Sequence, residues 1–369
     1  MKLAIRELLR RPGRFLSAGA ILTLIAMLLM ILGGLLDGLT RSSTGAIRAQ
    51  DVGVIVYSDS ARASFIRSRI DAPTRAAVEA ADGVTEVGGI GVVQLGARLP
   101  DSGPRDLADV ALFGYEIAPK GVPEPPADGE AWADEVLKAD GVEEGMELLL
   151  GPERTPVTVV GFVSDTSYAG QGSLWATEAT WREALTANRP DSQLAADVDQ
   201  SLVVRGEGDA AELASVIDAA TSGLTDSYTI PDAVAAIPGV EEQTSTFNQI
   251  IGVTVVIALV VIALFFALLT VERTALYGVL KALGARSTTI FGGLVLQAVA
   301  VTSGAVAIAG GLALLLDRVI PPGSIPLYIT PSRIVSSAVL LLLAAVVGCG
   351  FSLRRVLRVD PASAIGTSS

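Results

Sequence analysis

Residues that commonly carry catalysis or hold metals are scarce in this sequence. It has no histidine, one cysteine and four methionines among 369 residues. The absence of histidine excludes histidine-based zinc sites, a Ser–His nucleophilic pair and His-ligated haem. The chain also lacks a Walker A loop, a nucleophile elbow, an HExxH motif and a dinucleotide fingerprint in its strand context. The sequence therefore predicts a protein that is not an enzyme, and any step driven by ATP would need a separate ATPase.

The spacing that most clearly indicates a binding surface is an apolar stripe within residues 272–289. Its members recur at i, i+3, i+4 and i+7 with basic neighbours; they are Leu276, Val279, Leu280 and Leu283, flanked by Arg273, Lys281 and Arg286. This pattern predicts a short amphipathic helix, with Gly284 as its stop. Such a helix either anchors the loop at a membrane interface or docks into a groove on a partner protein.

Four uncharged apolar runs must position this loop. They cover residues 15–36, 250–271, 290–316 and 334–351. Each is close to, or beyond, the roughly 20 residues that a helix needs to cross a bilayer. The first run is too long for a signal peptide core and has no good cleavage site, so we expect an uncleaved helix. The sequence predicts one span, a large inserted domain, and then three spans.

The distribution of lysine and arginine predicts the orientation. Basic residues concentrate in residues 1–14, in the loop 272–289 and in the tail 352–369. These segments alternate correctly with four crossings, so the positive-inside rule places all three in the cytoplasm. We therefore expect a multi-pass protein of the plasma membrane with both termini cytoplasmic. The domain 38–248 and the loop 317–333 are then outside.

The predicted outer domain is strongly acidic. Residues 38–248 contain 34 acidic and 14 basic side chains, a net charge of −20. Such a domain is not expected to bind nucleic acid or an anionic lipid surface. The acidity indicates either a solvated exterior or attraction of a cationic substrate.

Strand and helix patterns are mixed in this domain without strict alternation. We expect an α+β domain, built either as one body or as two small lobes. The predicted helices are 63–70, 73–81, 130–138, 178–185 and 209–220, and the predicted strands are 51–57, 84–99, 110–117 and 202–205, with a hairpin at 147–150 and 156–163.

The sequence also predicts two helices next to the spans. Lys2–Arg11 has apolar and basic faces and suits the inner membrane interface. Residues 239–248 lead into the second span as a stalk helix. Small residues also recur at four-residue spacing in the spans, which permits close helix packing; the pairs are Gly34/Gly38, Ala263/Ala267, Ala307/Gly311 and Ala344/Gly348.

Three segments together carry a family resemblance. Residues 272–285 read ERTALYGVLKALGA, residues 359–365 read VDPASAI, and residues 3–11 read LAIRELLRR. They resemble the cytoplasmic signature, the tail and the amphipathic start of FtsX/MacB-type (type VII) ABC transporter permeases. The resemblance covers the whole chain, including the one-plus-three topology. Within the family, the segments 51–69, 134–161 and 237–246 are most similar to the DevC/HrtB branch.

The resemblance implies a machine with a partner. Family members are homodimeric permeases that work with two copies of a cytoplasmic ATPase, which binds ATP and magnesium; the permease has no cofactor of its own. Closure of the cytoplasmic ends is relayed along stalk helices to the outer domain. The stripe Leu276, Val279, Leu280 and Leu283, with Lys281 and Arg286, would then be the coupling helix that contacts the ATPase.

HrtB-like members export haem, so the resemblance makes haem efflux from the membrane the leading interpretation. Without histidine, an axial ligand would be methionine, tyrosine, cysteine or a carboxylate. Met27 and Met30 lie in the first span, and Glu241 and Glu242 near the outer start of the second could supply an anionic partner. Each also has an ordinary interpretation, as a packed methionine or a solvated stalk residue. Cys349 lies toward the cytoplasmic end and is a weaker candidate.

Other functions remain open from the sequence. The cargo could be another amphipathic molecule, such as a lipid, a lipopeptide or a drug. The protein could instead transmit force to an extracellular cell-wall hydrolase, as the FtsX branch does, and transport nothing. A sensory partner of a two-component system is disfavoured, since related sensing permeases have more spans.

Overall fold

The computed structural model describes residues 12–100, 103, 107–272, 278–281, 283–320 and 325–357. The chain divides into two compact units. We call residues 1–37, 245–320 and 327–369 the membrane unit, and residues 38–244 with 321–326 the sheet domain. The predicted helix 2–11 and the tail beyond residue 357 lie outside the described residues.

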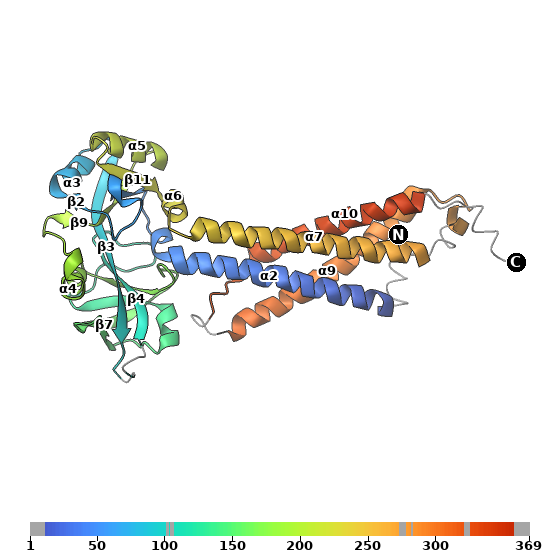
Figure 1. The fold of residues 1–369 in the computed structure, drawn as a ribbon, viewed down its shortest axis with the longest axis horizontal. Coiled ribbons are helices and arrows are strands. Elements are labelled where there is room, and N and C mark those ends of the chain that lie inside the picture. The colour runs from blue at the N-terminus through green and yellow to red at the C-terminus, as the bar shows by residue number, and fades with distance from the viewer. Residues whose placement is uncertain are drawn as a thin grey trace. The chain divides into compact units, whose positions relative to one another are not determined.

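Four long helices match the four apolar runs. They are α2 (Pro12–Arg48), α7 (Val240–Glu272), α9 (Ser287–Val319) and α10 (Pro331–Leu357) (Figure 1). Each is long and apolar enough to cross a membrane. Two of them continue far beyond the predicted spans, because the end of an apolar run does not end a helix: α2 runs to Arg48, and α7 begins at Val240. The predicted stalk before the second span is therefore confirmed as part of α7.

Small residues bring helices of the membrane unit together. A Cβ atom on Gly348 of α10 would lie 3.1 Å from the Leu259 carbonyl oxygen and 3.3 Å from the Ala263 nitrogen of α7. Glycine therefore permits close approach of the two backbones, as the Ala344/Gly348 spacing predicts. Large apolar side chains point outward from these helices, as lipid contact requires; examples are Leu24, Leu28, Val256, Val260, Leu264, Leu315 and Leu343.

A single mixed sheet forms the centre of the sheet domain. In the described residues it has nine strands in the order β11–β1–β10–β3–β4–β8–β5–β7–β6. Their bounds are β1 Val54–Ser58, β3 Val84–Arg98, β4 Leu107–Tyr115, β5 Glu130–Asp134, β6 Glu147–Leu150, β7 Thr155–Val163, β8 Gly172–Ala176, β10 Ser201–Gly206 and β11 Thr225–Thr229. A separate pair joins β2 (Ile70–Asp71) to β9 (Val198–Asp199). The long strand β3 holds the sheet together, because it pairs with β10 along its first half and with β4 along its second.

Short helices complete this α+β domain, and the expected fold class is confirmed. They are α3 (Ala72–Glu79), α4 (Glu178–Asn188), α5 (Ala210–Ala220) and α6 (Ile230–Ala235), with 3-10 turns η1 (Asp59–Ala61), η2 (Glu135–Asp140) and η3 (Pro190–Ser192). The hydrophobic core forms separate clusters along the sheet. The aromatic cluster is the one used below; it contains Tyr57, Phe65, Phe113, Tyr115 and Trp175, together with the ends of two long helices.

Two predicted helices are wrong. Residues 63–69 form bends and turns and Ile70 begins β2, because Arg62 and Ala63 have φ angles of 50° and 52°, which a right-handed helix does not allow. This conformation lets Phe65 enter the aromatic cluster, where its ring centroid lies 5.2 Å from that of Tyr57.

Residues 130–138 form strand β5 and the 3-10 helix η2 instead of one α-helix. Pairing with β7 and β8 outweighs the helical propensity of this segment. The side chain of Asp134 then caps η2 by accepting a hydrogen bond from the Val136 N–H. The elements β8, β11 and α6 were not predicted from the sequence.

Tight packing between β3 and α4 gives a test of the sheet domain. A Cβ atom on Gly91 would lie 2.2 Å from the ring of the buried Trp181. We expect Gly91→Ala to lower the free energy of unfolding by about 1–3 kcal/mol through overpacking. The matched control is Gly96→Ala on the same strand, where the new atom meets a terminal carbon of Leu107 at 3.1 Å and that side chain can move. Equal thermal stability of the two variants would contradict the packing argument.

Candidate functional site

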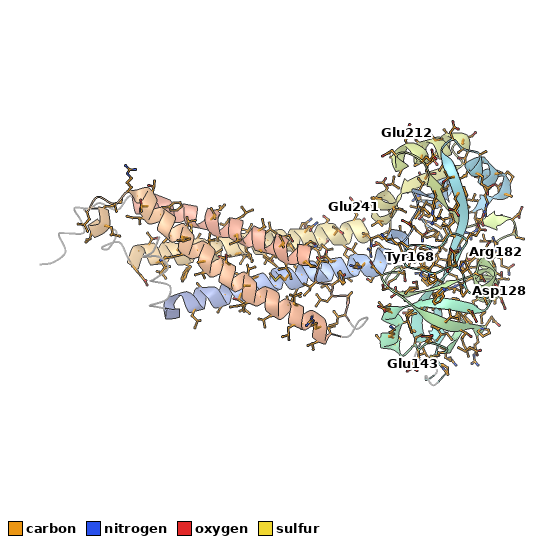
Figure 2. The ribbon with its side chains drawn as sticks, turned by 180° about the vertical axis from the view of Figure 1, so that it is seen from behind. Asp128, Glu143, Tyr168, Arg182, Glu212 and Glu241 are labelled. Carbon is orange, nitrogen blue, oxygen red and sulfur yellow. The ribbon has the colours of Figure 1, made fainter. Side chains whose placement is uncertain are left out.

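The residues proposed as haem ligands do not form one described cluster. Met30 is completely buried in the membrane unit, where it packs with Leu29, Ala309 and Leu341, and Met27 is partly buried beside it. Glu241 and Glu242 belong to the sheet domain and are exposed in the first turn of α7. Glu241 is labelled in Figure 2. In the described part of the chain, no group of three or more acidic or cysteine side chains could hold a metal ion. The ligand assignment stays a prediction.

The predicted coupling stripe is partly described. Leu276 lies outside the described residues. The helix closes at Gly284, as predicted: the Gly284 N–H donates to the Lys281 carbonyl at 3.0 Å and the Ala285 N–H to the Leu280 carbonyl at 2.9 Å. The φ of +90° at Gly284 is typical of the glycine that ends a helix in this way.

Part of the apolar stripe is exposed, so its side chains can contact another molecule. Val279 and Leu283 are 47% and 80% exposed, so these apolar side chains are available to a partner or a membrane surface. Leu280 and Lys281 are half-buried, and Arg286 is exposed at the cap of α9.

A joint at the end of α2 was not predicted from the sequence. It is formed by residues 41–48 of α2 and the loop 164–171, all within the sheet domain. Asp165 accepts hydrogen bonds from two arginines: Arg41 Nε lies 2.9 Å from Oδ1, Arg48 Nη2 lies 2.6 Å from Oδ1 and Arg48 Nη1 lies 3.2 Å from Oδ2. The two arginines are seven residues apart and therefore share one face of the helix.

Backbone contacts reinforce this joint. The Ala46 N–H donates to the Ser167 carbonyl at 3.0 Å, and Thr44 forms a β-bridge with Tyr168. A Cβ atom on Gly45 would lie 2.9 Å from backbone atoms of Asp165 and Ser167, so only glycine permits this approach. The helix is therefore held by its main chain as well as by charged side chains.

The joint rests on the aromatic cluster. The Tyr168 ring, labelled in Figure 2, packs edge-on against Phe113 and Phe65 at centroid distances of 5.5 and 6.0 Å. Ala46 and Ile47 of α2 and Val240 of α7 belong to the same buried cluster. The ends of the two long helices thus share one hydrophobic core.

A buried carboxylate orders the loop of the joint. Asp134 is 1% exposed, and besides capping η2 it accepts hydrogen bonds from the Thr166 N–H at 3.0 Å and from the hydroxyls of Thr166 and Ser167 at 2.9 Å. Burial raises the pKa of Asp134, and these hydrogen bonds offset part of that effect. Sequence reasoning missed this residue because it assigned Asp134 to a helix.

The pKa of Asp165, which pairs with the two arginines, shifts in the opposite direction. Burial alone would raise the pKa of Asp165, but the hydrogen bonds and positive charges of Arg48 and Arg41 lower it below its ordinary value. Asp165 therefore stays ionised near neutral pH, as a charge-assisted pair requires. Its φ of +60° is uncommon for a residue other than glycine and is held by the surrounding contacts.

Comparison with known proteins shows a family match for about the last third of the chain. Residues 248–361 match the model of the FtsX-like permease C-terminal domain. The proposed hemin transport system permease protein HrtB of Staphylococcus epidermidis is 32% identical over 125 residues, which cover 34% of this chain and 35% of that relative. HrtB of Staphylococcus haemolyticus is 32% identical over 111 residues, covering 30% and 31%. The match thus spans about a third of the length of these relatives.

Other relatives match over the whole length. An uncharacterized ABC transporter permease of Mycobacterium bovis is 27% identical over 376 residues and covers 98% of both chains. Among solved structures, the periplasmic region of MacB from Actinobacillus actinomycetemcomitans has a TM-score of 0.35 and 11% identity, covering 52% of this chain and 96% of that one. Residues 248–361 thus match an FtsX-like permease C-terminal domain, and the whole chain is similar from end to end to uncharacterized ABC transporter permeases.

Proposed function

We propose that the chain is the membrane subunit of an ATP-driven exporter in the plasma membrane. Two copies form the permease and bind two copies of a cytoplasmic ATPase. Both termini lie in the cytoplasm and the acidic sheet domain lies outside, as the distribution of basic residues indicates. Similarity to ABC transporter permeases supports the partner ATPase.

The joint at Asp165 is the observation that carries the proposed mechanism. The helices α2 and α7 each continue unbroken from an apolar span into the sheet domain. There, the end of α2 is held to the loop 164–171 by the ion pairs of its Arg41 and Arg48 with Asp165 and by main-chain hydrogen bonds. A movement of the span is then passed on as a movement of the domain, because a helix is stiff along its axis and the joint resists slippage. We infer that ATP-driven motion reaches the outer domain by this route.

The coupling helix would begin this relay. Leu276, Val279, Leu280 and Leu283 supply an apolar stripe, with Lys281 and Arg286 beside it, for a groove on the ATPase. The large exposure of Leu283 supports this role, because burying an exposed leucine side chain against a partner contributes favourable free energy to binding.

The proposed cargo is haem. The hemin permeases that match a third of the chain support this choice. Met30 and Met27 would ligate iron from the first span, with Glu242 or Glu241 as an anionic partner. Because Met30 is completely buried, ligation requires that the surrounding helices or loop first move.

The joint can be tested by hydrogen exchange. Asp165→Asn keeps a residue that tolerates positive φ but removes the charge, so we expect a loss of about 1–3 kcal/mol in local stability. Amide exchange in residues 42–48 should accelerate by about 5- to 150-fold, since about 1.4 kcal/mol corresponds to tenfold. The exposed Asp191 gives the control Asp191→Asn. Unchanged exchange at these amides in Asp165→Asn would contradict the role of the charge.

The joint should also depend on pH. Since the folded-state pKa of Asp165 is lowered, its contribution to stability is complete above the ordinary aspartate pKa of about 3.9 and is lost as the pH falls below it. The protection factors of amides 42–48, which compare the measured exchange with the intrinsic exchange rate at each pH, should therefore fall on acidification below about pH 4 in the native chain. Asp165→Asn should lack this dependence.

The coupling stripe can be tested by binding. Leu283→Asp places a charge on the stripe and should weaken binding of the ATPase roughly 10- to 100-fold, as expected for losing burial of one leucine. Leu224→Asp is the matched control, because Leu224 is 58% exposed in the sheet domain. If both variants bind the ATPase with equal affinity, the stripe is not part of the interface.

The cargo can be tested with purified protein and hemin. Met30→Leu preserves most of the side-chain volume without the sulfur, so it should change the Soret band of the hemin-loaded protein and reduce hemin efflux from lipid vesicles. Met146→Leu in the sheet domain should change neither. If the native complex with its ATPase neither binds nor exports hemin, haem is not the cargo, and another amphipathic molecule or control of an extracellular hydrolase becomes the better proposal.

A further inference from the structure

Residues 327–330, which lead into α10, contact α2 within the membrane unit. The Tyr328 N–H donates to the Gly34 carbonyl at 2.9 Å, and Ile329 is only 6% exposed. Ile329 and Leu327 pack into the cluster that contains Met30. We call residues 327–333 the strap. It covers apolar surface of α2 that would otherwise be open at this point.

Two glycines of α2 shape the surface under the strap. A Cβ atom on Gly33 would lie 2.3 Å from Cδ of Arg333. A Cβ atom on Gly34 would lie 3.0 Å from Ile329 and 3.1 Å from Leu327. The Gly34/Gly38 spacing predicted helix packing, but Gly34 instead makes room for the strap. Larger residues at these positions would force the strap away from the helix.

An ion pair fixes the end of the strap. Arg333 Nε donates to Asp37 Oδ2 at 2.9 Å, and Arg333 Nη2 donates to Asp37 Oδ1. Asp37 is the only acidic residue in the sequence of α2, and Arg333 is the only charged residue of the span Pro331–Gly350. Each side chain is 24% exposed, so separating the pair at the edge of an apolar bundle would leave two poorly solvated charges. The bidentate geometry makes the contact both strong and directional.

The covered surface is the one that carries the candidate ligands. Met30, Gly33, Gly34 and Asp37 are spaced at i, i+3, i+4 and i+7, so they lie on one face of α2. Met27 lies one turn further along this face. A molecule moving along the face toward the Asp37 end must displace the strap.

We propose that the strap is a gate on the cargo path, closed in this structure and locked by the Arg333–Asp37 pair. Opening the pair releases Leu327 and Ile329 from Gly34 and uncovers Met30 for an apolar or amphipathic molecule from the surrounding membrane. The proposal rests on the exporter function, but it concerns access to a face of α2 and does not depend on which cargo uses it.

Thiol labelling tests the gate without any cargo. The full chain is placed in lipid vesicles with Cys349→Ala and Met30→Cys, and the rate of reaction with N-ethylmaleimide is measured. Asp37→Asn or Arg333→Gln should each raise this rate about tenfold, and the double variant should be no faster than the quicker single variant, because both changes break one contact. Arg318→Gln is the matched control, since it removes an exposed arginine at the end of α9. Rates equal to this control in both single variants would overturn the gate.

A disulfide lock gives a second test if the charge variants fail to insert. Gly34 and Ile329 suit a disulfide, because a Cβ atom on Gly34 lies 3.0 Å from Ile329 Cγ1 and the two Cβ atoms are then at most about 4.5 Å apart. With Gly34→Cys and Ile329→Cys in the Cys349→Ala background, oxidation should stop hemin efflux from vesicles that contain the ATPase, and reduction should restore it. Efflux that continues at the same rate after oxidation would contradict the gate. If the native complex exports no hemin but labelling at residue 30 still responds to Asp37→Asn, the cargo is wrong and the gate stands.

Discussion

Asp165 holds two arginines of one helix, and this contact fixes how the long helix α2 is attached to the sheet domain. Arg41 and Arg48 lie two turns apart on one face of the helix and reach the same carboxylate, so rotation of the helix about its axis would break both contacts together. The loop that carries Asp165 is itself ordered by the buried carboxylate of Asp134, which accepts hydrogen bonds from Thr166 and Ser167. Tyr168 then seats the same loop on the aromatic cluster. A charged contact is thus supported by a buried polar network and by packing, which strengthens the hold on residues 41–48 inside the sheet domain.

The same helix serves two purposes at different positions. Around Met30, Gly33 and Gly34, its surface is apolar and smooth, and the strap covers it. Beyond Asp37, the helix becomes polar and its arginines and Gly45 attach it to the sheet domain. In the proposed cycle, a force applied to α2 at the cytoplasmic side would act on the strap and on the joint through one stiff element. Opening of the cargo path and movement of the outer domain would then be coupled without a separate signal.

The features predicted well from sequence are those with strong local signals. Apolar runs of about 20 residues mark the spans because a bilayer demands them, and Gly284 marks a helix end because it tolerates positive φ. The joint was not predicted because its parts are far apart in the sequence. Arg41 and Asp165 are separated by 124 residues, and no local pattern around Asp165 indicates its partner. The strand β5 was read as helical since its pairing with β7 and β8 cannot be seen locally. Gly34 was read correctly as a site of close packing, but its partner is a loop and not a helix.

The central claim is that the joint transmits motion from the membrane spans to the sheet domain. Its most direct test is the ratio of hemin exported to ATP hydrolysed, measured in vesicles that contain the permease and its ATPase. The account predicts that Arg41→Gln with Arg48→Gln preserves ATP hydrolysis while export per ATP falls severalfold, and that Arg205→Gln, which removes an exposed ion pair with Glu86 elsewhere in the sheet domain, leaves the ratio unchanged. An unchanged ratio in the Arg41/Arg48 variant, with the joint shown to be loosened by hydrogen exchange, would contradict it.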